Sequence, residues 1–141
     1  MYKKYRKGIF CIAYSGHPIR YLLLHIKLHW KGWEFPKGGS LARERPENTV
    51  KRELMEETGL RPIHIKRFPV KGSFIYDKKT QAELRVKGFR YVLFSAKVEK
   101  GKVRLSKKEH DGYRWCSYQQ ALKLLTWPDQ RKYIKIVRRA I

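Results

Sequence analysis

The sequence predicts a single domain with an α/β or α+β sandwich fold, in which strands are mixed with three helices. Two observations predict this class. Short stretches rich in β-branched, aromatic and aliphatic residues recur along the chain, and between them lie segments with helix-start and helix-stop signals. The length of 141 residues fits one hydrophobic core, and no internal repeat or low-complexity linker divides it. The predicted domain therefore spans residues 1–141.

The first two strands are expected at Ile9–Tyr14 and Tyr21–Leu28, with Ser15–Pro18 as the turn between them. The basic N-terminus followed by an apolar stretch is also how a signal peptide begins. That stretch is short, however, and no clear small-residue cleavage site follows it, so a strand is the better interpretation. The segment Trp30–Gly39 holds three glycines and a proline and is expected to be mainly loop.

A helix is expected at Pro46–Thr58. Proline suits the first helical turn, because it lacks an N–H that would have no partner there, and Gly59 suits a left-handed C-terminal cap. Val50 and Leu54 are four residues apart and should face the core.

The remaining chain carries signals for four further strands and, after them, two helices. Ser117 with Gln120 forms a capping box for a helix that ends near Leu125, and Pro128 is expected to open a last helix that ends near Arg139. The further predicted strands are Ile63–Val70, Gly72–Tyr76, Gly88–Val98 and Gly112–Cys116.

Composition limits the class of protein. The 42% of hydrophobic residues suffices for a folded core, and no apolar run is long enough to span a bilayer, so no membrane association is expected. The two cysteines, Cys11 and Cys116, both lie in apolar stretches, as expected for buried thiols in a reducing cytoplasm. Lys and Arg total 34 against 12 acidic residues, a net charge of +22 that attracts nucleotides, RNA or anionic surfaces.

Three carboxylates stand out in this basic chain. Glu53, Glu56 and Glu57 are three and four positions apart, so a helix places them on one side. Their mutual repulsion destabilises the helix unless a cation neutralises them, and hard oxygen ligands suit Mg²⁺. Arg52 is placed to orient or partly neutralise the cluster. A merely solvated acidic face is a weak explanation in a chain with so few acids.

These residues belong to a longer motif that resembles the Nudix box, G-x5-E-x7-R-E-U-x-E-E-x-G-U, in which U is a bulky aliphatic residue. Every specified position matches: Gly38, Glu44, Arg52, Glu53, Leu54, Glu56, Glu57, Gly59 and Leu60. The resemblance implies an α/β/α sandwich with a mixed sheet, a loop–helix–loop motif, and hydrolysis of a nucleoside diphosphate linked to another group.

The resemblance also implies roles for the box residues. Glu53, Glu56 and Glu57 would bind Mg²⁺ or Mn²⁺ together with the backbone carbonyl of Lys37, and one of these three glutamates would double as general base. Glu44 and Arg52 would support the cluster. Gly38 and Gly59 would provide the tight turn and the helix cap.

Two segments outside the box resemble the asymmetric diadenosine tetraphosphate hydrolases. Trp33–Gly38 is similar to their W-x-x-P-K-G run, and Leu105–Trp115 is similar to L-S-x-E-H-x-x-Y-R-W with one extra lysine here. By this resemblance Lys37 would meet the phosphate chain, and Glu109 would be a metal ligand or base. Trp127, with Tyr76 opposite, would stack on adenine. Either Lys87 or Arg90 would neutralise the distal phosphates.

Two functions therefore compete. The first is cleavage of diadenosine tetraphosphate to ATP and AMP by in-line attack of water. The second is removal of pyrophosphate from RNA 5′ ends, since Trp33, Phe35, Pro36, Gly38 and Gly39 also match the W-x-F-P-x-G-G run of the RNA pyrophosphohydrolases. The net charge favours the second function, whereas the segment from Leu105 to Trp127 favours the first. We expect the first.

Overall fold

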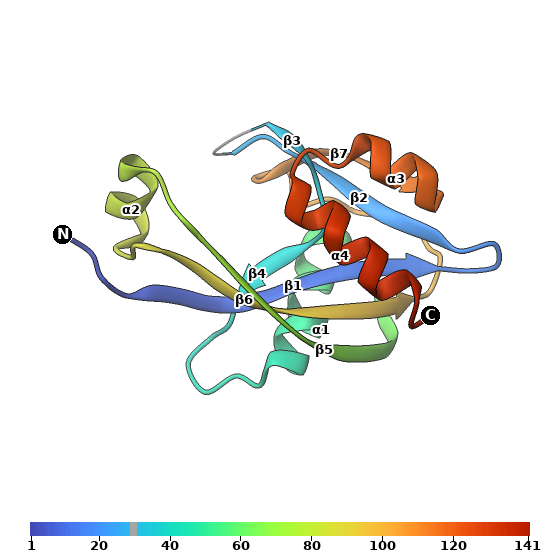
Figure 1. Cartoon of the computed structure of the whole chain (residues 1–141), viewed down its shortest axis with the longest axis horizontal. Coiled ribbons are helices and arrows are strands. Elements are labelled where there is room, and N and C mark those ends of the chain that lie inside the picture. The colour runs from blue at the N-terminus through green and yellow to red at the C-terminus, as the bar shows by residue number, and fades with distance from the viewer. Residues whose placement is uncertain (29–30) are drawn as a thin grey trace.

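The computed structural model describes residues 1–28 and 31–141 and confirms a sandwich of helices on both faces of a mixed β-sheet (Figure 1). The strands are β1 (Tyr5–Ser15), β2 (Arg20–Ile26), β3 (Gly32–Glu34), β4 (Lys37–Gly39), β5 (Pro62–Ile75), β6 (Gly88–Val98) and β7 (His110–Cys116). The helices are α1 (Pro46–Thr58), α2 (Lys78–Leu84), α3 (Tyr118–Leu124) and α4 (Pro128–Arg138).

The sheet is organised around β1, which is buried on both faces from Ile9 onward. The strand order is β3-β2-β1-β6-β5, with β4 paired to β1 and β7 paired to β2. Only the β1–β6 pair is parallel among the described strands. Because the central strands are covered on both sides, they are continuous apolar runs rather than alternating ones.

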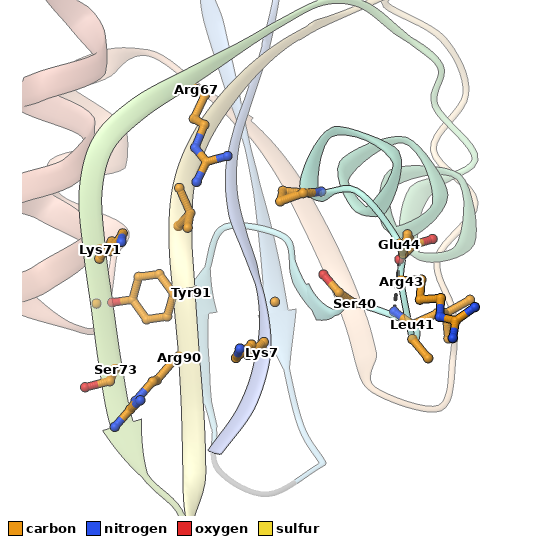
Figure 2. A pocket seen from close by; sticks show the side chains of 15 residues that line it. Lys7, Ser40, Leu41, Arg43, Glu44, Arg67, Lys71, Ser73, Arg90 and Tyr91 are labelled. Carbon is orange, nitrogen blue, oxygen red and sulfur yellow. Dashed lines mark hydrogen bonds between the residues drawn. The ribbon is translucent and has the colours of Figure 1, made fainter. Parts of the chain in front are cut away.

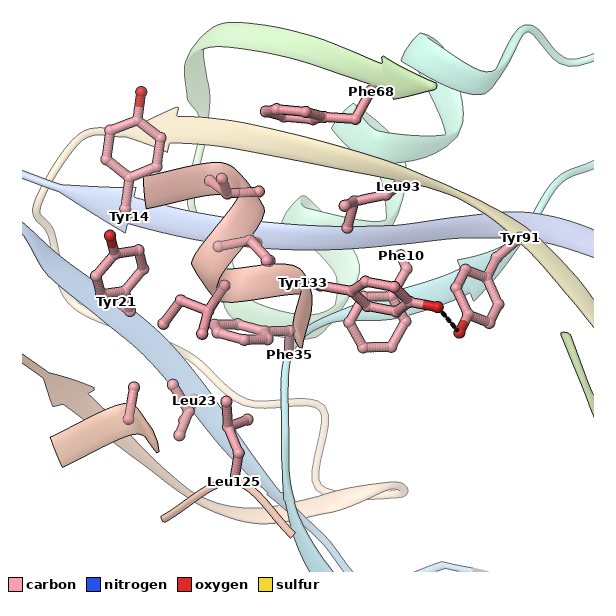
Figure 3. Close-up of a cluster of buried hydrophobic side chains, with 14 of the residues drawn as sticks. Phe10, Tyr14, Tyr21, Leu23, Phe35, Phe68, Tyr91, Leu93, Leu125 and Tyr133 are labelled. Carbon is pink, nitrogen blue, oxygen red and sulfur yellow. Dashed lines mark hydrogen bonds between the residues drawn. The ribbon is translucent and has the colours of Figure 1, made fainter. Parts of the chain in front are cut away.

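The two faces carry separate cores. Val50 and Leu54 of α1 pack on one face against Ile9 and Cys11, as their spacing predicts. The other face packs against α3 and α4 and is rich in aromatic residues (Figure 3). There the hydroxyl groups of Tyr91 and Tyr133 are hydrogen-bonded at 2.9 Å, which satisfies both buried groups.

The structure corrects the element predictions at three places. Helix α2 was not expected; it is short and polar, and Asp77 caps it by accepting a hydrogen bond from the Thr80 N–H. The segment predicted as mainly loop contains β3 and β4, which exist only because β2 and β1 pair with them; Trp30 itself lies outside the described residues. The two strands predicted on either side of Lys71 form the single strand β5, irregular between Arg67 and Lys71.

Within the described residues, no helix is long and apolar enough to cross a membrane.

Candidate active site

The acidic motif is presented by α1 and the loop before it. Gly59 ends the helix with a φ of 72°, a left-handed conformation that favours glycine, and its N–H donates to the Met55 carbonyl at 2.9 Å. The three glutamates of the helix do not share one environment. Glu53 and Glu57 are buried, whereas the Glu56 side chain is 57% exposed.

Arg52 holds the acidic groups around it in place. Its guanidinium donates to both oxygens of Glu44 at 2.9 Å and to the Gly39 carbonyl at 2.7 Å. It also donates to Glu53 at 3.0 Å and lies 3.3 Å from Glu56. Hydrogen bonds from Arg52 are the main reason that the pKa of Glu44 falls to about 2, and the pKa of Arg52 is raised in turn. This geometry is what a supporting role for Glu44 and Arg52 requires.

Gly38 is needed because the Glu53 side chain lies directly against it. A Cβ atom at residue 38 would lie 2.0 Å from Cδ of Glu53, far inside contact distance. The absence of a side chain lets the carboxylate approach the backbone of β4. Residue 38 thus sets the position of a carboxylate that is fifteen residues further along the chain.

Glu57 is the least neutralised of the buried acids. One of its carboxylate oxygens is buried without a hydrogen-bond partner among the described residues. Burial raises the pKa of Glu57 well above its usual value, and the negative charges of Glu53, Glu109 and Glu34 raise it further. Burial is also the main cause of the raised pKa of Glu53. An unpaired buried carboxylate beside like charges is stabilised by a cation.

Glu109 joins this cluster from a distant part of the chain. It lies just before β7, where its carbonyl accepts a hydrogen bond from the Lys27 N–H at 2.9 Å. Glu53, Glu57 and Glu109 line one cavity of about 430 Å³, which we call the carboxylate cavity. Its other lining residues include Arg6, Lys37, Gly38 and Tyr76.

Glu34 is a site residue that sequence reasoning missed. It is 2% exposed, and the Lys37 ammonium donates to both of its carboxylate oxygens at 2.6 and 2.8 Å. The His110 Nε2 atom lies 3.6 Å from one of these oxygens. Burial alone would raise the pKa of Glu34, but Lys37 and His110 outweigh it and hold the pKa below its usual value. The available clue was an acidic residue inside the apolar segment Trp33–Pro36.

A second cavity of about 270 Å³ adjoins the first, and Lys37 lines both. We call it the aromatic cavity, because Phe10, Phe74, Tyr91 and Trp127 line it. Trp127 is half-buried, and its ring lies so close to Gly32 that a Cβ there would be 2.9 Å from the indole. Tyr76 lines the carboxylate cavity instead. The structure therefore does not bring Tyr76 and Trp127 together as two faces of one stacking site.

Lys87 and Arg90, the two candidates for the distal phosphates, line neither of these cavities. The Arg90 guanidinium lies 4.1 Å from the centre of the Tyr5 ring, and the Lys87 ammonium lies 5.9 Å from it. Arg90 lines a third, open hollow between the sheet and the loop that precedes α1 (Figure 2).

Comparison with known proteins agrees with this geometry. The sequence profile of the NUDIX domain matches residues 4–136. The chain belongs to the NUDIX family of hydrolases. It is 29% identical over 103 residues to the RNA pyrophosphohydrolase of Pseudomonas paraeruginosa, a match that spans 65% of each chain.

Solved NUDIX structures show the same fold. A Caenorhabditis elegans Ap4A hydrolase binary complex is 20% identical with a TM-score of 0.67, covering 95% of this chain and 96% of that one. The NUDIX domain of Shewanella oneidensis NrtR, complexed with ADP ribose, is 18% identical with a TM-score of 0.77, covering 99% and 90%.

NUDIX hydrolases generally use divalent metal ions, and the donors of this chain fit one. Among the described residues, no three acidic, His or Cys side chains already converge on one point. Glu53, Glu57 and Glu109 instead surround a cavity, and the unpaired oxygen of Glu57 is left for a cation. Hard carboxylate oxygens are the ligands that such ions prefer. Glu56 stays at the exposed rim, against Arg52.

Proposed function

We propose that this chain hydrolyses dinucleoside tetraphosphates, with diadenosine tetraphosphate giving ATP and AMP, and that it uses Mg²⁺ or Mn²⁺ and works in the cytoplasm. The observation that carries the proposal is the position of Lys37, which lines both the carboxylate cavity and the aromatic cavity. A substrate with a base at one end and phosphates at the other has a matching place in each cavity.

The aromatic cavity suits a nucleobase. Trp127 and Phe74, both half-buried, offer flat apolar surfaces, on which a base stacks at little entropic cost. Asp129 and Gln130 line the same cavity and supply polar groups for the edge of the base. Half-buried Trp127 is the residue from which we expect the largest contribution.

Lys37 and Glu34 suit the phosphate chain that follows. The Lys37 ammonium is held against buried Glu34, so its position is defined before the substrate arrives. A preorganised charge of this kind attracts phosphate oxygens without reorganisation at the moment of reaction. Arg6 lines the carboxylate cavity and adds a second cation there.

The carboxylate cavity suits the bond cleavage. When bound, a divalent ion supplies positive charge that polarises the phosphate and favours deprotonation of the attacking water. Glu53, Glu57 and Glu109 would hold it, and one of these carboxylates would accept the proton of the water. The water oxygen then bonds to one phosphorus as the bridging P–O bond breaks, and the displaced nucleotide leaves as a phosphate anion.

A parallel assay tests the proposal. Diadenosine tetraphosphate, ADP-ribose, nucleoside triphosphates and 5′-triphosphorylated RNA are offered to the same preparation, and the products are identified. We expect the highest kcat/KM for the tetraphosphate, with ATP and AMP as products.

Hydrolysis of RNA 5′ ends is the second candidate function. It is supported by the identity to an RNA pyrophosphohydrolase and by the net charge of +22, which is larger than a dinucleotide requires. The match covers 65% of the length of that relative. A preference of tenfold or more for triphosphorylated RNA in the same assay would replace the first candidate with this one.

A further inference from the structure

The third hollow of the molecule is lined by five cationic side chains. It measures about 870 Å³ and lies between the loop that precedes α1 and strands β5 and β6 (Figure 2). We call it the basic trough, and its cationic residues are Lys7, Arg43, Arg67, Lys71 and Arg90. All five are exposed. They come from four separate parts of the chain, so only the tertiary structure gathers them.

The trough carries almost no opposing charge. Its one acidic lining residue is Glu44, whose two carboxylate oxygens are already bonded to Arg52. In the part of the chain that the structure describes, no carboxylate forms an ion pair with any of the five cations. Scattered surface lysines are the ordinary explanation of a basic protein. Five unpaired cations around one concavity instead form a local field that favours a polyanion.

The shape and position of the trough favour a chain of phosphates. A membrane surface is flat and fits a flat or convex basic surface, whereas this site is recessed between a loop and a sheet. A groove of cations that follows a phosphate backbone is the usual way to bind single-stranded nucleic acid. Leu41, which is 60% exposed, lies among the cations and offers apolar surface to a base.

The trough also ends close to the carboxylate cavity. Both hollows reach the start of β1, where the consecutive residues Lys7 and Arg6 line the trough and the cavity from opposite faces of the strand. On the other side, a single guanidinium, that of Arg52, contacts both Glu44 of the trough and Glu53 of the cavity. A strand in the trough can therefore place its end near the carboxylates.

We infer that the basic trough binds single-stranded RNA. The inference rests on the nucleotide chemistry proposed above, because it takes the RNA 5′ end to lie toward the carboxylate cavity. It adds a second binding site, separate from the aromatic cavity, to the proposed function.

The test measures binding without hydrolysis. A labelled 12-nucleotide RNA is titrated in EDTA at several salt concentrations, and its fluorescence anisotropy gives Kd. The variant combines Lys7→Gln, Arg67→Gln and Lys71→Gln, which removes three trough charges at exposed positions. We expect Kd to rise at least about tenfold at low salt. The slope of log Kd against log salt should fall by about 2, because each contact to a single strand contributes about 0.7.

A control variant with the same net charge separates the trough from the general field. It combines Lys123→Gln, Lys135→Gln and Arg139→Gln, three exposed cations on or next to α3 and α4. We expect its Kd to rise less than threefold. Equal weakening in both variants would refute a defined trough, and so would unchanged binding in the trough variant. If the triple variant does not fold, Lys71→Gln alone should still raise Kd about threefold.

Two further measurements distinguish failure of this inference from damage to the active-site cavities and from failure of the proposed function. Hydrolysis of diadenosine tetraphosphate by the folded trough variant should stay within twofold of wild type, so loss of RNA binding cannot be assigned to damaged cavities. RNA binding in EDTA is independent of which substrate is cleaved, so a wrong proposed function would leave this result intact. Binding to anionic phospholipid vesicles through the same three residues, with no effect on RNA, would make the trough a membrane site and overturn the inference.

Discussion

The carboxylate cavity and the basic trough lie on either side of the start of β1, and they handle charge in opposite ways. Four of the 12 acidic residues line the cavity, Glu53, Glu57, Glu83 and Glu109, and three more, Glu34, Glu44 and Glu56, are bonded to Lys37 or Arg52 beside it. Most of these are wholly or partly buried, and Arg52 or Lys37 neutralises several of them through short hydrogen bonds. The cations of the trough are exposed, and none of them forms an ion pair with a carboxylate of residues 1–28 or 31–141.

The contrast shows how charge, burial and function are connected here. A buried charge is costly unless a partner is fixed beside it, so every cavity acid except Glu57 has a defined neighbour or is open to water. An exposed charge needs no partner, because water screens it. We therefore expect substitutions in the cavity to change catalysis by orders of magnitude, and substitutions in the trough to change affinity in small increments that depend on salt.

The largest effect is expected from Glu57→Gln. The change keeps the shape of the side chain but removes the charge, so kcat should fall at least about 10²-fold while the fold is retained. Steady-state kinetics beside circular dichroism measure both. Excess EDTA should abolish wild-type turnover. The control is Glu99→Gln, which changes an exposed acid outside the site and should leave kcat and the fold unchanged. Near-full activity in the Glu57 variant would mean that the buried cluster has no catalytic role.

Gly38→Ala should also act through the cavity. The new methyl group would occupy the place of the Glu53 carboxylate and displace it, and a shift of about 1 Å can cost on the order of 10²-fold in rate. The control is Gly101→Ala, where the nearest atom to a new Cβ is 3.7 Å away. Comparison of kcat/KM for the two variants tests the contact. Equal activities would show that Glu53 is free to move.

Trp127→Ala should change KM more than stability. Stacking is worth about 1–3 kcal/mol per base, so KM for the tetraphosphate should rise roughly five- to two-hundred-fold. Because Trp127 is only half-buried and lines a cavity, Tm should fall little. Trp115→Ala, which packs against the α1 side of the core, should show the reverse pattern. A sharp fall in Tm with no change in KM would assign Trp127 to packing.

The smallest expected effect concerns pH and the stability of the metal-free protein. The pKa of Glu57 is raised in the folded state, so the neutral acid is the form that folding favours. Its stabilising effect is complete below the unfolded pKa of about 4.3 and is lost as pH rises toward the folded value. In EDTA, wild-type Tm should therefore fall relative to Glu57→Gln by a few degrees between pH 4 and pH 7.

The same melting experiment has two internal checks. Groups with lowered pKa, such as Glu44, act in the opposite direction in both proteins and cancel in the comparison. Added Mg²⁺ should raise Tm of the wild type at pH 7 and leave the variant less affected, because the unpaired carboxylate then gains a partner. Parallel Tm profiles for the two proteins would show that Glu57 is neutralised from within the chain.

The sequence alone predicted those features of the structure that depend on the spacing of residues close together in the chain. The start of α1 at Pro46, its cap at Gly59 and the separation of Glu53 from Glu57 all follow from helix geometry, which repeats over a few residues. The strands at the centre of the sheet were also predictable from their apolar runs. The alignment of Gly38 with the acidic helix followed from the resemblance to the Nudix box.

Tertiary structure alone decided which distant residues meet. Glu109 reaches Glu57 only because β7 pairs with β2, and Glu34, three residues from its partner Lys37, is buried only because β3 lies beside β2. Other contacts between elements place Trp127 and Tyr76 in different cavities, and the β1–β6 and β5–β6 pairings bring together most of the cations of the trough. Local spacing specifies neighbours along one helix or strand. Contacts between elements depend on strand order and register, which arise only when the whole core packs.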